Sequence, residues 1–126
     1  ANNGSLVTPT VLMKDSTSIV EKDTNISNDD FKIVQEGMRM SVTEGTAKPL
    51  NFPYVEIAAK TGTAEVGVLK ESVNSWIIGY FPYENPKYAF AVVMERRESK
   101  NPIGGLFVMT NLIDWMHQNT PEYLEN

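Results

Sequence analysis

The hydrophobic pattern changes its period several times along the chain, and each change predicts a new element. The segment from Ser5 to Met13 is apolar but contains Pro9, which predicts an edge strand or an extended segment, followed by a polar hairpin and loop. From Ser27 onward the period becomes helical. It predicts a helix with one buried stripe of residues at helical spacing: Phe31, Val34, Met38 and Val42.

Local signals support the ends of this helix. Ser27 is suited to be its N-cap, and Asp29 and Asp30 suit the positive end of the helix dipole. No third and fourth ligand accompany these two aspartates, so helix capping is favoured over a metal site. Gly45 is suited to close the helix, and Gly37 inside it predicts a close packing contact.

Three strand-like segments follow a loop with two prolines. They are expected over Val55–Val66, Ser75–Phe81 and Tyr88–Glu95. The turn-rich connector PYENPK predicts that the second and third strands form an antiparallel hairpin.

A second helical pattern begins after two consecutive glycines, Gly104 and Gly105. Its apolar stripe contains Leu106, Met109, Leu112, Ile113 and Met116. The polar tail NTPEYLEN is expected to fray. The order of strand, helix, three strands and helix predicts an α+β fold in which an antiparallel sheet is flanked by helices.

The amino-acid composition argues against several kinds of partner and site. The chain of 126 residues is 41% hydrophobic and 21% charged, which is typical of one globular domain, and its net charge of −5 argues against a nucleic-acid partner. The absence of cysteine excludes disulfides, thiolate zinc sites and a cysteine nucleophile. No apolar run reaches the roughly 18 residues of a membrane span.

The segment IAAKTGTAEV places a lysine inside an apolar strand. At a cleft edge, the ammonium of Lys60 is able to stabilise negative charge beside a nucleophile and to help relay a proton. Thr61 and Thr63 offer hydroxyls for a carboxylate, and Gly62 lets a substrate backbone approach. An edge strand also accepts a peptide as an added strand. The alternative for four such residues alone is a solvated lysine beside a glycine bulge.

Flanking motifs point to one family. NNGSLVTP, EGMRMSVTEGTA, AAKTGTAE and NSWIIGYFP occur in this order, and YAFAVVME with the final helix completes the series. The series resembles the transpeptidase domain of class B penicillin-binding proteins, whose K-T-G element is shared with serine β-lactamases. Two departures are Ala59, where many relatives have glycine, and Asn74, where relatives often have histidine.

The family reaction also needs a serine nucleophile in S-x-x-K and a second serine in S-x-N. No serine in this chain has a lysine three residues later. Ser72-Val73-Asn74 matches S-x-N in letters but follows Lys60 and lies just before an expected strand, so we interpret it as structural. The resemblance therefore implies that residues 1–126 are the C-terminal half of the domain, with the catalytic serine and any membrane anchor upstream.

The resemblance implies a D,D-transpeptidase that cross-links peptidoglycan stem peptides ending in D-Ala-D-Ala and is acylated by β-lactams. It implies that Lys60 supports the S-x-N serine, that Thr61 and Thr63 hold the terminal carboxylate, and that the Thr63 N–H serves the oxyanion hole. No metal or organic cofactor is implied. The resemblance also implies that the intact protein acts at the extracytoplasmic face of a bacterial membrane, in a complex with a cell-wall polymerase.

Three alternatives remain on this scaffold: a D,D-carboxypeptidase, a β-lactamase-like hydrolase, or a non-enzymatic β-lactam sensor or scaffold. The chain alone is expected to be inactive and, through exposed apolar surfaces, to self-associate.

Residues outside the K-T-G-T segment are expected to be structural. His117, the only histidine, is expected at the surface near the end of the last helix. Trp76, Tyr80 and Phe81 are expected in the core. For Glu65, a role at the rim of the substrate groove and an ordinary surface position are equally plausible.

Overall fold

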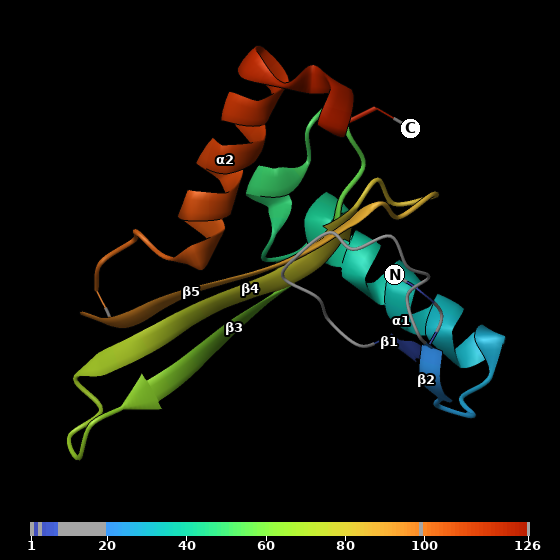
Figure 1. The fold of residues 1–126 in the computed structure, drawn as a ribbon. Helices are drawn as coiled ribbons and strands as arrows, with labels where there is room; N and C mark the ends of the chain where they lie inside the picture. Colours follow the sequence, from blue (N-terminus) through green and yellow to red (C-terminus); the bar gives the residue numbers. More distant parts are fainter. Residues whose placement is uncertain (1, 3, 8–19, 99, 126) are drawn as a thin grey trace.

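The fold is known from a computed structural model that describes residues 2, 4–7, 20–98 and 100–125. Its centre is a sheet in the order β3-β4-β5, in which β3 (Ala58–Val66), β4 (Ser72–Phe81) and β5 (Tyr88–Glu98) pair antiparallel. Helix α2 (Gly105–Asn119) lies over one face of this sheet, and α1 (Asn28–Thr43) crosses the end where β3 begins (Figure 1). The predicted α+β fold is confirmed.

A second, two-stranded sheet lies beside α1. It pairs β1 (Ser5–Val7) with β2 (Val20–Asp23) in antiparallel register. The segment predicted as extended over Ser5 to Met13 is described only as far as Val7, and residues 8–13 lie outside the described residues.

The predicted start of α1 is confirmed, whereas the predicted buried stripe is wrong. Ser27 Oγ accepts a hydrogen bond of 3.1 Å from the Asp30 N–H, as an N-cap does. Val42 is fully buried, but Val34 is 59% exposed, and Phe31 and Met38 are half-buried. The reason is tertiary, because within the described residues only the C-terminal end of α1 contributes to the main core.

The two glycine predictions for α1 have different outcomes. No heavy atom of the described residues lies within 4 Å of a Cβ built on Gly37, so the predicted close contact is wrong there. Gly45 follows the C-cap residue Glu44, and its N–H donates to Met40 O at 3.1 Å. A Cβ at Gly45 would lie 2.9 Å from Ser41 Cα, so this glycine permits a close backbone approach.

All three predicted strands exist, with shifted ends. β3 begins at Ala58 and not at Val55, because its ladder to β4 starts with the Ala58–Tyr80 pair. β4 begins at Ser72, because the ladder continues to the Val66–Ser72 pair. Ser72-Val73-Asn74 therefore lies inside a strand, contrary to the expectation that it precedes one.

The core lies between α2, the sheet and the loop that follows α1. It contains Val42, Ala47, Leu50, Val55, Ile57, Ala59, Ile77, Phe81, Met109, Ile113 and Leu124. The helices η1 (Lys48–Leu50) and η2 (Pro121–Tyr123) bring Leu50 and Leu124 to this cluster. The prediction that the tail frays is thus wrong at Leu124, which is 4% exposed.

Candidate active-site strand

The K-T-G-T segment occupies the middle of β3, whose second edge pairs with no strand in the described part of the chain. Lys60 pairs with Ile78 and Gly62 with Trp76. Thr61 pairs with Ile77 and Thr63 with Ser75. Since paired residues share a face and neighbours alternate, Lys60 lies on the sheet face opposite to Thr61 and Thr63.

The two faces differ in their surroundings. The face of Thr61 and Thr63 is the α2 side, where Ile77 is fully buried and Ser75 Oγ accepts a hydrogen bond of 3.1 Å from the Gly105 N–H. On the face of Lys60, Trp76 is 42% exposed, Ile78 49% and Val93 39%. The core prediction therefore holds for Tyr80 and Phe81 and is wrong for Trp76, because no described segment covers this part of the sheet.

Lys60 presents an exposed ammonium at the strand edge. Its Nζ donates a hydrogen bond of 2.6 Å to Thr61 O and forms no ion pair within the described residues. Its charge is therefore compensated by one carbonyl dipole and solvent, and it remains available to an anion at this edge.

The two threonines differ in their environment. Thr61 is half-buried, and its Oγ1 lies 2.7 Å from Thr46 Oγ1, in a hydrogen bond that ties the loop after α1 to the strand. Thr63 is exposed, and its hydroxyl has no partner among the described residues. Sequence reasoning did not assign Thr46 a contact. The motif EGMRMSVTEGTA contains Thr46 and was the available signal. The sequence alone does not show how close this residue lies to β3, because that distance depends on tertiary packing.

Gly62 is open on the side away from the sheet. A Cβ built there would meet only Trp76 Cβ, at 3.5 Å, which is ordinary van der Waals contact. The packing of the chain itself therefore does not demand glycine at position 62, so the interpretation as a site of close substrate approach remains a prediction.

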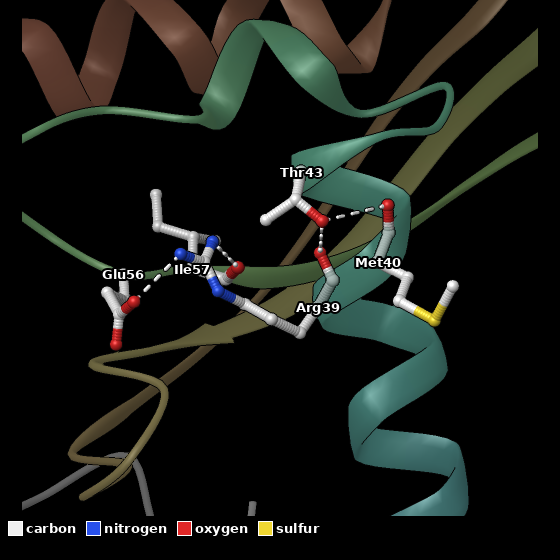
Figure 2. A network of polar contacts seen from close by, with 5 residues as sticks. All are labelled: Arg39, Met40, Thr43, Glu56 and Ile57. Atoms are coloured by element: carbon white, nitrogen blue, oxygen red, sulfur yellow. Dashed lines mark hydrogen bonds and ion pairs between the residues drawn. The ribbon is translucent and has the colours of Figure 1, made fainter.

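A clamp from α1 fixes the segment that leads into β3 (Figure 2). Arg39 donates one hydrogen bond of 3.1 Å to Ile57 O and one of 2.9 Å to Glu56 Oε1. Its guanidinium also lies 5.9 Å from the ring centroid of Tyr83. Sequence reasoning missed Arg39, because its partners lie 17 and 18 residues further along the chain.

The remaining candidates have structural contacts. His117 is exposed at the end of α2, as predicted, and stacks on Tyr54 with a centroid distance of 3.7 Å. The Tyr54 hydroxyl donates to Asp114 at 3.4 Å. Burial, and then the Asp114 carboxylate, raise the pKa of Tyr54 to about 12.

Glu65 forms an ion pair of 2.8 Å with Lys70 across the β3–β4 turn. This contact favours the surface assignment of Glu65. Within residues 20–98 and 100–125, no three His, Asp or Glu side chains are grouped so that they could hold a metal ion. In that same part of the chain, neither α1 nor α2 is long and apolar enough to cross a membrane.

Known proteins with similar sequences share one domain family. The family model of the penicillin binding protein transpeptidase domain matches residues 1–105. Penicillin-binding protein H of Bacillus subtilis is 38% identical over 78 residues, which are 56% of this chain and 11% of that protein. Peptidoglycan D,D-transpeptidase FtsI of Buchnera aphidicola is 31% identical over 111 residues, which are 75% of this chain and 19% of that protein.

Solved structures with a similar fold include penicillin-binding proteins. The transpeptidase domain of Burkholderia pseudomallei penicillin-binding protein 3 superposes with a TM-score of 0.72 at 20% identity, covering 96% of this chain and 40% of that one. An acyl-enzyme complex of penicillin-binding protein A from Mycobacterium tuberculosis gives a TM-score of 0.59 at 28% identity, covering 78% of this chain and 24% of that one. The fold expected from the resemblance is confirmed.

The chain spans less than a fifth of the length of either curated relative. The family match nevertheless covers most of the chain and includes β3 with its K-T-G-T segment. The chain therefore belongs to the penicillin-binding protein transpeptidase domain family.

Proposed function

We propose that this chain is the C-terminal half of the transpeptidase domain of a class B penicillin-binding protein. The intact protein would be a D,D-transpeptidase that cross-links peptidoglycan stem peptides through a serine acyl-enzyme. The observation that carries the proposal is the open edge of β3, on which an exposed Lys60 and an exposed Thr63 lie three residues apart.

A substrate peptide would add to β3 as a further strand, since the N–H and C=O groups of an unpaired edge are free to bond. Lys60 and Thr63 reach this edge from opposite faces, so a terminal carboxylate bound there would lie between an ammonium and a hydroxyl. Thr61 would contribute from its bonded position beside Thr46, and Gly62 would leave room for the peptide backbone.

The nucleophilic serine would come from a segment that covers the open sheet face beside Lys60. That face exposes the apolar side chains of Trp76, Ile78 and Val93, and burying them is favourable. Lys60, on the same face, would then support the proton transfers of the S-x-N serine, while the Thr63 N–H would stabilise the oxyanion. The 126-residue chain alone would be inactive because it lacks S-x-x-K.

The proposed partners follow from this activity. They are stem peptides ending in D-Ala-D-Ala, β-lactams that acylate the same serine, and a cell-wall polymerase. The proposed location is the extracytoplasmic face of the membrane. The carboxypeptidase, β-lactamase-like, sensor and scaffold alternatives rest on the same strand, and no described contact favours one of them.

The test is the intact mass of the protein from the full reading frame after incubation with a penicillin. We expect one stoichiometric adduct, on a serine upstream of this chain, that persists for a transpeptidase and is rapidly hydrolysed for a β-lactamase. A well-folded protein that forms no adduct would contradict the enzymatic proposal and favour a scaffold.

A further inference from the structure

The far end of the sheet carries an arginine in an unusual backbone conformation. Val73 pairs with Arg97 and Ser75 with Met94, so that Glu95 and Arg96 both face the single residue Asn74. This is a β-bulge, a feature that re-aims side chains and is common beside active sites.

The bulge is held by a specific contact. Arg96 has a φ of +48°, in the left-handed region that residues other than glycine rarely adopt. Asn74 Oδ1 accepts a hydrogen bond of 2.9 Å from the Arg96 N–H, which satisfies the donor that the bulge removes from the ladder. A strained, side-chain-supported conformation is a reason to look for a function of Arg96.

Arg96 lines a surface pocket at the end of β3. The pocket has a volume of about 170 Å³, and its other lining residues are Val66, Gly67 and Ser72. Val66 and Ser72 are paired across the hairpin, and Val66 lies on the same sheet face as Lys60 by strand alternation. The pocket therefore opens on the proposed catalytic face, roughly 10 Å beyond Thr63 at the usual rise per strand residue.

The chemistry of the lining suits a carboxylate. Arg96 forms no ion pair within the described residues, whereas the nearby Lys70 is paired with Glu65. Ser72 adds a hydroxyl donor, and a Cβ at Gly67 would meet no heavy atom within 4 Å, so the approach is open. A guanidinium with an adjacent hydroxyl and open space binds a carboxylate well.

Neighbouring charges restrict the ligand further. Glu71 and Glu98 line an adjoining pocket that shares Ser72 and also contains Lys100. The negative charge of these two carboxylates disfavours a polyanion more strongly than a ligand that carries a single carboxylate.

We propose that Arg96, with Ser72, forms a subsite for a carboxylate carried by the peptide substrate upstream of its terminal dipeptide. The proposal rests on the proposed function. A peptide antiparallel to β3, with its terminal carboxylate at Thr63, extends its preceding residues toward Val66. A residue about three positions before the peptide's end would lie beside Val66. Arg96 is on β5, two strand spacings from β3, so the carboxylate would be carried on a long side chain that extends over Val66 into the pocket.

The test compares two peptides ending in D-Ala-D-Ala that are identical except for a carboxylate or a carboxamide about three residues before the end. Binding to the full-reading-frame protein is measured by calorimetry, for the wild type, Arg96→Gln, Arg96→Lys and the control Lys100→Gln. We expect the wild type and Lys100→Gln to prefer the carboxylate peptide by about tenfold, as for one charge-assisted contact. Arg96→Gln is expected to abolish the preference, and Arg96→Lys to retain part of it.

Equal binding of the two peptides by the wild type, or equal weakening of both by Arg96→Gln, would overturn the subsite. Failure to bind either peptide would overturn it as well. Acylation by penicillin is measured in parallel, because a β-lactam without an upstream peptide does not use the subsite. A missing adduct refutes the proposed function, whereas a normal adduct without carboxylate preference refutes only the subsite.

Discussion

At the residue scale, β3 contains positions that the chain's own packing does not explain. Lys60 is exposed with a carbonyl as its described partner, and Gly62 has space for a side chain. An exposed lysine is ordinary in itself. Both positions are open to solvent, as the proposed binding of a ligand at this edge requires.

Gly62→Ala is predicted to leave the free energy of unfolding within about 0.5 kcal/mol of the wild type, as for other substitutions away from packed features. Its added methyl would meet only Trp76 Cβ, at van der Waals distance. Acylation by penicillin is predicted to fall at least about tenfold, because the methyl occupies the path of the substrate backbone. Chemical denaturation and adduct kinetics measure the two effects.

Gly79→Ala is the matched control on the neighbouring strand. Its Cβ would collide with Ala58 O and the Phe90 ring, so a loss of about 1–3 kcal/mol of stability is expected. If Gly62→Ala destabilised the protein as much as Gly79→Ala, glycine at position 62 would be structural and its assignment to substrate approach would be wrong.

At the element scale, the contact between α1 and the start of β3 fixes where the strand begins. Arg39 satisfies the Ile57 carbonyl from its side chain, and the N–H of Tyr83 donates to Glu56 O at 2.9 Å. Both groups lie just before the first ladder pair, Ala58 with Tyr80. The Arg39 side chain from α1 and the backbone of the segment after β4 therefore take the place of regular ladder bonds at this point.

Arg39→Met is predicted to lower the free energy of unfolding by about 1–3 kcal/mol, because it leaves the part-buried Ile57 carbonyl without its charged donor. Lys32→Met, on the exposed surface of the same helix, is the control and should change stability by less than about 0.5 kcal/mol. Equal stabilities of the two variants, measured by chemical denaturation, would contradict the clamp.

The raised pKa values of two tyrosines predict that the protein loses stability at alkaline pH. Burial is the main cause that raises the pKa of both Tyr54 and Tyr80 to about 12, whereas a tyrosine in an unfolded chain titrates near 10. Between these values the folded state holds more protons than the unfolded state, so stability is complete below about pH 10 and is lost as the pH rises toward 12.

The melting temperature is therefore predicted to fall between about pH 10 and 12, and Tyr54→Phe should reduce the slope of that fall. Thermal melts at a series of alkaline pH values, with the wild type and the variant in parallel, make the comparison. A slope unchanged by Tyr54→Phe would contradict this prediction, because it would show that the pKa of Tyr54 is the same in the folded and unfolded states.

Sequence patterns predicted what local chemistry determines. The start of α1 follows from Ser27 and the Asp30 N–H, three residues apart, and the antiparallel hairpin follows from its turn-rich connector. Patterns did not predict the exposure of Val34 and Trp76, because exposure depends on which other segment covers a face. For the same reason the K-T-G-T segment was located from sequence, but its contacts with Thr46 and the clamp by Arg39 were not.

At the scale of the whole molecule, the described chain leaves apolar side chains exposed on two surfaces. One is the sheet face with Trp76, Ile78 and Val93. The other is on α2, where Phe107 is 52% and Trp115 54% exposed. Contiguous exposed apolar patches are typical of surfaces that another segment or chain covers.

We predict that residues 1–126, produced alone, self-associate through the sheet face. Replacing Trp76 by Gln and Ile78 by Thr should shift the sedimentation profile toward monomer, because both side chains lie on this face. The protein from the full reading frame should show no such shift. A monodisperse monomer of the isolated chain, at concentrations where it is fully folded, would contradict this prediction.

The central claim is that the Lys60 ammonium on the edge of β3 serves an acyl-transfer site. The most direct test is the second-order rate constant for acylation of the full-reading-frame protein by penicillin, measured for Lys60→Gln and for the control Lys70→Gln. Lys60→Gln is predicted to slow acylation by at least about 100-fold without changing the melting temperature, since its side chain is exposed. Lys70→Gln, at the β3–β4 turn, should stay within about twofold of the wild type, as its pair with Glu65 is exposed. Acylation of Lys60→Gln at the wild-type rate would contradict the account.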